Sequence, residues 1–479
     1  MMEWKRLLSP KRVGNYAKSS NVRSGDLRSE FEKDYHRIIG SSSFRRLQDK
    51  TQVFALDKSD FIRTRLTHSL EVSSFAKSMG QNIAQYLIEN HVDDTFTQET
   101  KADICDILQC AGLIHDIGNP PFGHFGEEAI RDWFVRRLHT LSFQGKPVTE
   151  VLTNQMVQDF YHFEGNAQAL RQVTKLHFLV NENGMNLTYA LLNTIIKYPV
   201  SSENINPESG KIAEKKMGFF HAEQPLYEMI AREMGTTGMR HPLTFILEAA
   251  DDIAYRTADI EDAFKKGCIS YEKLRDELET ACKRAVENGA AMDLKRLDPV
   301  AMMDHQFENA VKRGMANPRL YAVQNFLVRL QSSLIFCATY GFTSNYRAIM
   351  AGEYQHDLFY HTYGDWVIRA LGDIAYRYAF ISKPILQMEV SAWTILNFHM
   401  DHFVPAVIDY DTEAHLNMMD KKLVTLISEN YRQIYRLYSQ KTGDETEKLY
   451  LRLLLVTDFV SGMTDSYAKD LYQKLNGIS

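Results

Sequence analysis

Hydrophobic residues recur every three to four positions along most of the chain, which is the spacing of one face of an α-helix. The segment 64–90 repeats an apolar residue every four positions: Phe75, Met79, Ile83 and Leu87. The segment 101–115 and the C-terminal third show the same period, whereas the strict alternation of a β-strand is scarce. The pattern therefore predicts an all-α, mostly helical protein.

Polar stretches divide these helical segments without separating them into independent units. The clearest loop is 201–218, rich in Ser, Asn, Gly, Pro and Lys, and a shorter polar stretch covers 143–150. We expect one short β-hairpin near 211–221, where a glycine is flanked by bulky residues. With no repeat and no long linker, we expect a single chain with a catalytic core of about 30–270 and a helical C-terminal region of about 271–479.

Composition narrows the class of protein only slightly. Hydrophobic residues make up 44% of the 479 positions and charged residues 24%, as in ordinary globular proteins. The net charge of −6 argues against a general nucleic-acid coat protein, although it leaves room for a local basic pocket. Five cysteines without a CxxC spacing predict reduced thiols and a cytoplasmic location. The sequence contains neither a signal-peptide pattern nor an apolar run of membrane-spanning length, so we expect no membrane association.

The stretch GLIHDIGNPPFGHFGE, 112–127, is unusual because it combines glycines, two histidines and two of the chain's 12 prolines. His115 and Asp116 end an apolar helix just before Gly118 and the double proline, where the chain leaves helical geometry. Both side chains can therefore face one ion, and an imidazole with a carboxylate suits Mn²⁺, Mg²⁺, Fe²⁺ or Zn²⁺. The alternative is a histidine at a helix C-terminus beside a capping acid.

Two further segments supply residues for such a site. In RTRLTHSLEV, 63–72, Arg65 and His68 lie three positions apart and could form a phosphate clamp and a metal ligand. On a helical wheel of 245–264, four polar residues gather opposite an apolar stripe: Asp251, Tyr255, Asp259 and Asp262. The alternative is a solvated acidic face, but one of these acids could complete a set of two histidines and two aspartates.

The ordered set His68, His115–Asp116 and Asp251 resembles the HD-domain superfamily of metal-dependent phosphohydrolases. The resemblance is closer still to the deoxyguanosinetriphosphate triphosphohydrolases (dGTPases) of that superfamily. Stretches similar to that family follow in its order from about residue 30 to 470: RRLQDKTQVF, RTRLTHSLEV, HDIGNPPFGHFGE, HFEGNAQ, EAADDIAY and SGMTD. The resemblance implies a helical HD-domain core and hydrolysis of dGTP to deoxyguanosine and inorganic triphosphate, with Mn²⁺ or Mg²⁺ as the cofactor and Fe²⁺ or Zn²⁺ as alternatives.

The resemblance also assigns roles to individual residues. His124 matches the catalytic histidine of the family, and Glu127 matches the acid that orients it. The residues expected to bind substrate are Gln52 and Val53 beside the sugar, Arg65 on phosphate, Lys197 with Lys215 or Lys216 on the triphosphate, and Tyr255 and Asp259 at the sugar. Tyr255 would exclude a ribose, and Asp259 would accept from the 3′-hydroxyl. His162 is either a partner of the site or a histidine satisfied by its local contacts.

Other readings of these residues stay open at this point. A different HD phosphohydrolase, such as a broader dNTPase, a 5′-nucleotidase or a phosphodiesterase, needs the metal set but not the sugar and triphosphate residues. A non-catalytic nucleotide-sensing or nucleic-acid-binding module would not need all four ligands together with His124. Family resemblance further implies a homo-oligomer, either a hexamer or a tetramer, and makes single-stranded DNA or nucleotides plausible effectors.

Overall fold

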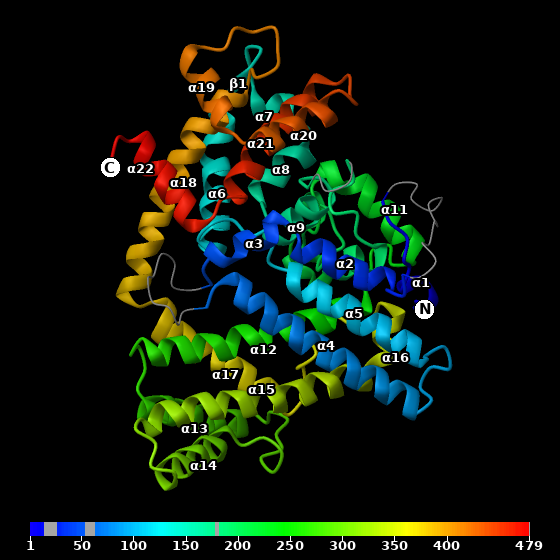
Figure 1. Ribbon diagram of the computed structural model, residues 1–479, viewed down its shortest axis with the longest axis vertical. Coiled ribbons are helices and arrows are strands. Elements are labelled where there is room, and N and C mark those ends of the chain that lie inside the picture. Colours follow the sequence, from blue (N-terminus) through cyan, green and yellow to red (C-terminus); the bar gives the residue numbers. More distant parts are fainter. Residues whose placement is uncertain (14–25, 53–62, 178–181, 479) are drawn as a thin grey trace.

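The computed structural model describes residues 1–13, 26–52, 63–177 and 182–478 and is helical almost throughout (Figure 1). The first half contains α1 (Trp4–Leu7), α2 (Glu30–Ile39), α3 (Ser42–Arg46), α4 (Arg65–Glu89), α5 (Gln98–Ile114), α6 (Gly123–Arg137), α7 (Val148–Val151), α8 (Asn154–Tyr161), α9 (Gly165–Thr174), α10 (Tyr189–Ile195), α11 (Gln224–Met234) and α12 (Pro242–Lys265). The second half contains α13 (Tyr271–Glu287), α14 (Pro299–Lys312), α15 (Pro318–Ser344), α16 (Tyr346–Ala351), α17 (Asp365–Ala375), α18 (Lys383–Val407), α19 (Met418–Leu426), α20 (Glu429–Ser439), α21 (Glu445–Ser461) and α22 (Asp465–Leu475).

The helices expected from apolar periodicity are confirmed. The pattern of 64–90 is α4, that of 101–115 is α5, and the acidic segment 245–264 lies within α12. Local sequence explains where they begin: the Thr64 side chain accepts from the backbone of Thr67 to cap α4, and Pro242 occupies the first turn of α12.

Two apolar clusters form the interior, and the helices divide between them. The first gathers α1 to α5, α10 to α12 and α13 to α17, the second gathers α6 to α8 with α18 to α22, and α9 contributes to both. Figure 1 shows α12, α13, α14, α15 and α17 together at one end of the molecule, and α7, α8, α19, α20 and α21 at the other. Residues 271–479 therefore contribute to both clusters, and a domain boundary near residue 270 stays a prediction.

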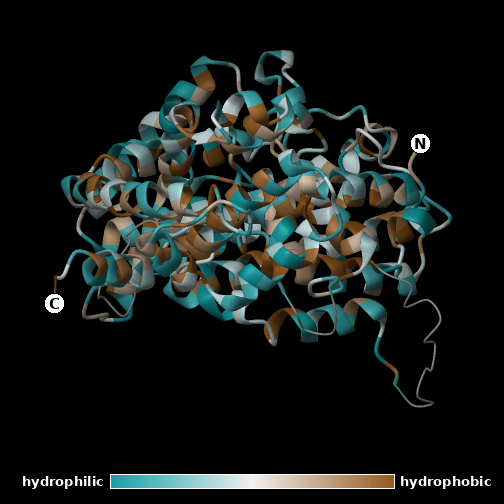
Figure 2. Cartoon of the chain, turned by 90° about the horizontal axis from the view of Figure 1, so that it is seen from above, coloured by the Kyte–Doolittle hydropathy of each residue, from teal (hydrophilic) through white to brown (hydrophobic). Residues whose placement is uncertain are grey.

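Hydropathy follows this arrangement. Apolar positions are concentrated inside the molecule and hydrophilic positions on its outer turns (Figure 2). Among the described residues, no helix combines the length and the apolar character needed to cross a bilayer. All five cysteines are free thiols, as their spacing predicts.

A short hairpin exists, but the expectation that it lies near 211–221 is wrong. The strands are β1 (Ser142–Phe143) and β2 (Lys146–Pro147), inside the stretch expected to be a polar loop. Gln144 and Gly145 between them both have positive φ, 50° and 78°, which suits a two-residue hairpin turn. Gly218 is needed for a different reason, because a Cβ there would lie 1.7 Å from the carbonyl oxygen of Tyr198.

Candidate active site

Three helices bring two histidines and an aspartate to one point. His68 lies in the first turn of α4, His115 directly follows α5, and Asp251 lies in the middle of α12. The Oδ1 atom of Asp251 is 3.1 Å from His68 Nε2 and 3.3 Å from His115 Nε2. One ligand atom from each of the three residues lies within 4.8 Å of the others, although the three residues are far apart in sequence.

The orientation of the His115 ring suits a cation between these side chains. Its Nδ1 lies 2.8 Å from the carbonyl oxygen of Gly112, so this nitrogen carries the proton of a neutral ring and donates it. The lone pair on Nε2 then faces the Asp251 carboxylate, and two acceptors repel unless a proton or a metal ion lies between them. Burial lowers the pKa of His115, but Asp116 and Asp251 outweigh it and raise the pKa above its ordinary value. Two imidazoles and a carboxylate therefore fit a divalent metal ion.

Asp116, the fourth expected ligand, lies beside the converging set. Its Oδ1 is 3.6 Å from His115 Nε2 and accepts from the side-chain amide of Asn119 at 2.7 Å. Its Oδ2 accepts from the Arg65 guanidinium at 2.5 Å. Burial alone would raise the pKa of Asp116, but Arg65 and His115 lower it well below the usual range, so the carboxylate is charged. Asp116 is therefore a charged carboxylate beside the three converging side chains, and it is paired with Arg65.

Glycines allow the loop after Asp116 to pack tightly. A Cβ at Gly118 would come within 2.1 Å of the backbone nitrogen of Ala169 on α9, so only glycine permits this contact. Phe122 and Gly123 both have positive φ, 64° and 65°, and a Cβ on Gly123 would meet the Arg65 guanidinium at 2.5 Å. The turn reverses the chain after the double proline, and α6 begins at Gly123.

The turn places His124 and Glu127 together in the first turn of α6. His124 Nδ1 is 3.2 Å from Glu127 Oε2, and the imidazole side chain is 69% exposed while the carboxylate is buried. The other carboxylate oxygen of Glu127 accepts from the backbone nitrogen of Gly165 at 2.8 Å. The hydrogen bond that His124 donates to Glu127 raises the pKa of His124, which favours the imidazolium. His124 is thus an exposed acid–base group whose ring is held by the buried Glu127 carboxylate.

A cavity of about 260 Å³ opens beside His124, and both halves of the sequence line it. Gln52 and His124 come from the N-terminal half and Tyr255 from α12 just past the midpoint, while Phe380 and Met388 come from the C-terminal third. The Tyr255 and Phe380 rings stack with centroids 6.2 Å apart. Val53, expected on the sugar side of the pocket, lies outside the described residues.

Asp259, one helical turn beyond Tyr255, is buried rather than solvated. It is 2% exposed, and within the described part of the chain neither of its carboxylate oxygens has a hydrogen-bond partner. Burial raises its pKa well above the usual range, with Asp262 adding to the effect. A hydroxyl that hydrogen-bonds to such a buried carboxyl group stabilises it. Because Asp259 is buried, the acidic face of α12 is not a solvated surface.

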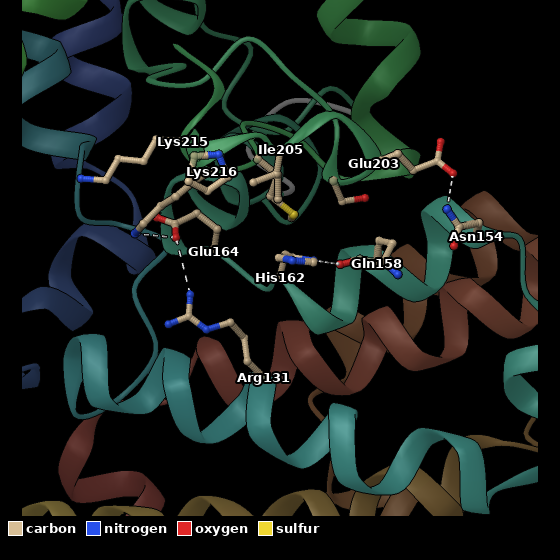
Figure 3. Close-up of a pocket in the computed structure, with 12 residues that line it drawn as sticks. Arg131, Asn154, Gln158, His162, Glu164, Glu203, Ile205, Lys215 and Lys216 are labelled. Atoms are coloured by element: carbon tan, nitrogen blue, oxygen red, sulfur yellow. Dashed lines mark hydrogen bonds and ion pairs between the residues drawn. The ribbon is translucent and has the colours of Figure 1, made fainter. Parts of the chain in front are cut away.

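Of the lysines expected to bind phosphate, two approach the site. Lys197 Nζ lies 3.0 Å from Asp251 Oδ2, and Lys216 Nζ lies 2.8 Å from the buried Glu164. Lys215 is exposed and points away from Glu164 in Figure 3, so the choice between the two neighbours favours Lys216. His162 contacts the carbonyl oxygen of Gln158 through Nδ1 at 3.2 Å, which supports the reading of a locally satisfied histidine.

Lys215 and Lys216 both line a second cavity of about 490 Å³ (Figure 3). Arg131 reaches into it and lies 4.0 Å from Glu164 Oε2, on the side opposite Lys216. Burial alone would raise the pKa of Glu127, but the hydrogen bond that His124 donates to it and the positive charges of His124, Lys216 and Arg131 lower that pKa below its usual value. The cavity thus places basic side chains next to the His124–Glu127 pair.

Sequence analysis missed several side chains that surround these groups. Glu164 and Asp465 fall within the quoted stretches HFEGNAQ and SGMTD, which gave the only signal that these positions matter. Phe380 and Met388 carry no motif, since an apolar residue of a helix is not distinguishable in sequence from one of the core. Met388 reaches the cavity because α18 packs against α6, and Phe380 reaches it because the segment before α18 packs against α12.

Comparisons with known proteins agree with this geometry. The HD domain family matches residues 65–189. A "Deoxyguanosinetriphosphate triphosphohydrolase-like protein" of Listeria monocytogenes is 45% identical over 483 residues, covering the full length of both chains. A protein of the same description from Pseudomonas aeruginosa is 32% identical over all of this chain and 99% of its own length. A "Deoxyguanosinetriphosphate triphosphohydrolase" of an Enterobacter species is 32% identical over 94% of each chain. Full-length similarity at this level, together with the converging histidines and aspartate, shows that the chain belongs to the deoxyguanosinetriphosphate triphosphohydrolase-like family of HD-domain hydrolases.

Proposed function

We propose that this chain hydrolyses dGTP to deoxyguanosine and inorganic triphosphate by attack of water at the α-phosphorus. The observation that carries the proposal is the convergence of His68, His115 and Asp251 next to the cavity that His124 and Tyr255 line. The Enterobacter relative, which is named for this reaction, supports the choice of substrate.

The chain's own residues divide the work along the substrate. Arg65, which is buried, and Lys197, which is partly buried, lie beside the carboxylates of the site and would bind phosphate oxygens, and Lys216 would bind the end of the triphosphate. Mn²⁺ or Mg²⁺ held by His68, His115 and Asp251 with Asp116 would supply Lewis-acid polarisation of the phosphate and a more acidic water. Fe²⁺ and Zn²⁺ suit the same donors.

His124 would move the proton. The bond between the 5′ oxygen and the α-phosphorus breaks, and the oxygen of water replaces the 5′ oxygen on phosphorus. His124 as imidazolium can protonate the leaving 5′ oxygen, or in its neutral form it can take a proton from the attacking water. Glu127 holds the ring in place for either role and favours the protonated form.

Product analysis tests the proposal directly. The protein is incubated with each of the four dNTPs and with GTP, in Mn²⁺ or in Mg²⁺, and products are separated by anion exchange. We expect deoxyguanosine and triphosphate, and in ¹⁸O-labelled water the label enters triphosphate, because water attacks phosphorus. Release of pyrophosphate or orthophosphate would instead favour another HD phosphohydrolase, and equal rates on all dNTPs would favour a broader dNTPase.

Discrimination between deoxyribose and ribose tests the role of Tyr255. An extra 2′-hydroxyl has to enter space filled by the ring, which costs about 1–3 kcal/mol, or roughly 5–150-fold in kcat/KM. We expect Tyr255→Ala to narrow the ratio of dGTP to GTP hydrolysis, while Tyr255→Phe, which keeps the ring, preserves it. A ratio unchanged in the alanine variant means that the 2′ position is read elsewhere.

The remaining properties rest on family resemblance. A homo-oligomer, regulation by single-stranded DNA or nucleotides and a cytoplasmic location are proposals of the same kind. Size-exclusion chromatography with light scattering, with and without dNTPs, tests the first two.

A further inference from the structure

Two segments about 410 residues apart in sequence meet around the loop that joins Asp116 to His124. Lys50 lies just before the bridge between Thr51 and Thr64, and Asp465 begins α22, immediately after the SGMT sequence. Both side chains are buried, at 2% and 1% exposure. Neither belongs to the site derived above, so their burial next to it needs an explanation.

Lys50 connects three parts of the chain. Its Nζ donates to the carbonyl oxygen of Asn119 at 2.5 Å and to that of Ser461, at the end of α21, at 2.7 Å. Its own carbonyl oxygen accepts from the backbone nitrogen of Arg65, at the start of the helix that carries His68. A buried lysine amine with two carbonyl acceptors fixes the distance between them, because its N–H donors would otherwise lie unsatisfied in the interior.

Asp465 holds the other end of the same loop. Its Oδ1 accepts from the backbone nitrogen of Phe122 at 2.9 Å, and its Oδ2 accepts from the backbone nitrogen and the hydroxyl of Thr51 at 3.0 and 2.5 Å. Lys50 and Asp465 therefore hold the main chain on the two sides of Pro120–Pro121. Neighbouring residues reinforce the junction, since Ser466 donates to Asp49 at 2.8 Å.

The loop needs such support. Phe122 adopts the left-handed conformation at φ 64°, which is unfavourable for a bulky residue and persists only where surrounding contacts impose it. At its other end, Asn119 donates its side-chain amide to Asp116. A shift of the loop would thus displace His124, two residues beyond Phe122, as well as the Asn119 contact with Asp116.

We propose that Lys50 and Asp465 are positioning residues, which fix the loop of residues 119–122 and thereby place His124 over the reacting phosphate. The kinetic part of this inference rests on the proposed function, whereas the mechanical part does not. The C-terminal helices, through Ser461 and Asp465, thus act on catalysis without touching substrate.

Amide hydrogen exchange tests the mechanical part without any assay of activity. We expect Asp465→Asn to speed exchange in peptides covering 117–124, because Phe122 loses a charged acceptor, while peptides of α5 and α15 exchange as in the wild type. Asp470→Asn is the matched control, since it makes the same change at an exposed position of the same helix. Unchanged exchange in 117–124 would overturn the proposal.

Kinetics test whether the effect passes through His124. A small displacement of a catalytic group lowers the rate of the chemical step by about 10- to 100-fold. We therefore expect Asp465→Asn and Lys50→Met to lower kcat by that factor, with KM for dGTP near the wild-type value. Lys469→Met, an exposed lysine of α22, is the control for the loss of a lysine. In a His124→Ala background, the same substitutions should lower kcat very little further.

The outcomes separate the two claims. An equal loss of kcat in the wild-type and His124→Ala backgrounds would mean that Lys50 and Asp465 merely support the fold, and the proposal would be wrong. If Lys50→Met does not fold, Asp465→Asn carries the test alone. If the wild-type protein releases no triphosphate from any dNTP, the proposed function fails, and hydrogen exchange still decides whether the loop is held as described.

Discussion

Two clusters of charged or metal-ligating side chains in this protein differ in the kind of contacts that they make. In the first cluster, Arg171 lies on α9 and Lys175 lies directly after it. Arg171 donates to Asp458 and to Glu223 at 2.6 to 2.8 Å, and Lys175 pairs with Glu223. In the second cluster, the acceptor atoms of His68, His115 and Asp251 face one another. The first cluster pairs donors with acceptors within itself, whereas the second leaves acceptors that only a proton or a cation can bridge.

The difference teaches how to distinguish a structural cluster from a functional one. Burial alone does not distinguish the two clusters, because Arg171 is 3% exposed and His68 is 0% exposed. What separates them is whether the cluster is electrostatically complete. Asp458 and Glu223 raise the pKa of Arg171 above its usual range despite burial, which is the behaviour of a closed ion-pair network.

Loss of the acid from the cluster of His68, His115 and Asp251 should have the largest effect. Asp251→Asn removes a carboxylate from the converging set, and we expect bound metal to fall to background and kcat to drop at least about 10³-fold, since Lewis-acid stabilisation is worth several kcal/mol. Asp252→Asn, which changes the adjacent acid outside that set, should keep the ion. Metal analysis of both variants beside their turnover decides the assignment, and full occupancy in Asp251→Asn would show that Asp251 is not a ligand.

Loss of Arg171 from its cluster with Glu223 and Asp458 should instead lower the free energy of unfolding. Arg171→Met leaves Glu223 and Asp458 without their main partner, and we expect the free energy of unfolding to fall by about 3–5 kcal/mol. Arg369→Met removes an exposed arginine paired with Asp365 at 2.7 Å and should cost less than about 1 kcal/mol. Urea unfolding measures both values. Equal losses in the two variants would contradict the distinction between buried and exposed pairs here.

An exposed residue of the open site should affect catalysis without affecting stability. His124→Ala should retain metal and dGTP binding yet lose at least about two orders of magnitude in kcat, the usual value of acid–base assistance. Because the side chain is 69% exposed, the free energy of unfolding should change by less than about 1 kcal/mol. Single-turnover rates and metal content are measured together. Loss of the ion would make His124 a ligand, and a near-wild-type rate would make it structural.

The smallest effect expected is a shift in pH dependence. Glu127 raises the pKa of His124 above its ordinary value, so Glu127→Gln should lower that pKa. Whether His124 acts as an acid or as a base, the limb of the kcat/KM profile that reports its titration should move to lower pH. Asp132→Asn, an exposed acid of the same helix, should leave the profile in place. A limb that does not move would mean that a different group titrates.

The two clusters also show what sequence can and cannot predict. Periodicity located α4, α5 and α12, and the HD order of His68, His115, Asp116 and Asp251 pointed to one site before any geometry was known. The Arg171 cluster carried no signal, because Arg171, Glu223 and Asp458 lie on separate helices and each is ordinary in its own segment. The hairpin was misplaced for a related reason, since Gly218 serves a contact with Tyr198 that only the fold creates.

The position of Asp458, Ser461 and Asp465 has a consequence for the order in which the protein is made. Synthesis proceeds from the N-terminus, so all the expected metal ligands have been made once residue 251 is added, about 200 residues before Asp458. At that stage Arg171 has no Asp458, Lys50 has no Ser461 and Phe122 has no Asp465. The nascent chain therefore contains the expected metal ligands before it contains the residues that hold the surrounding segments in place. The site is complete only after α21 and α22 have left the ribosome.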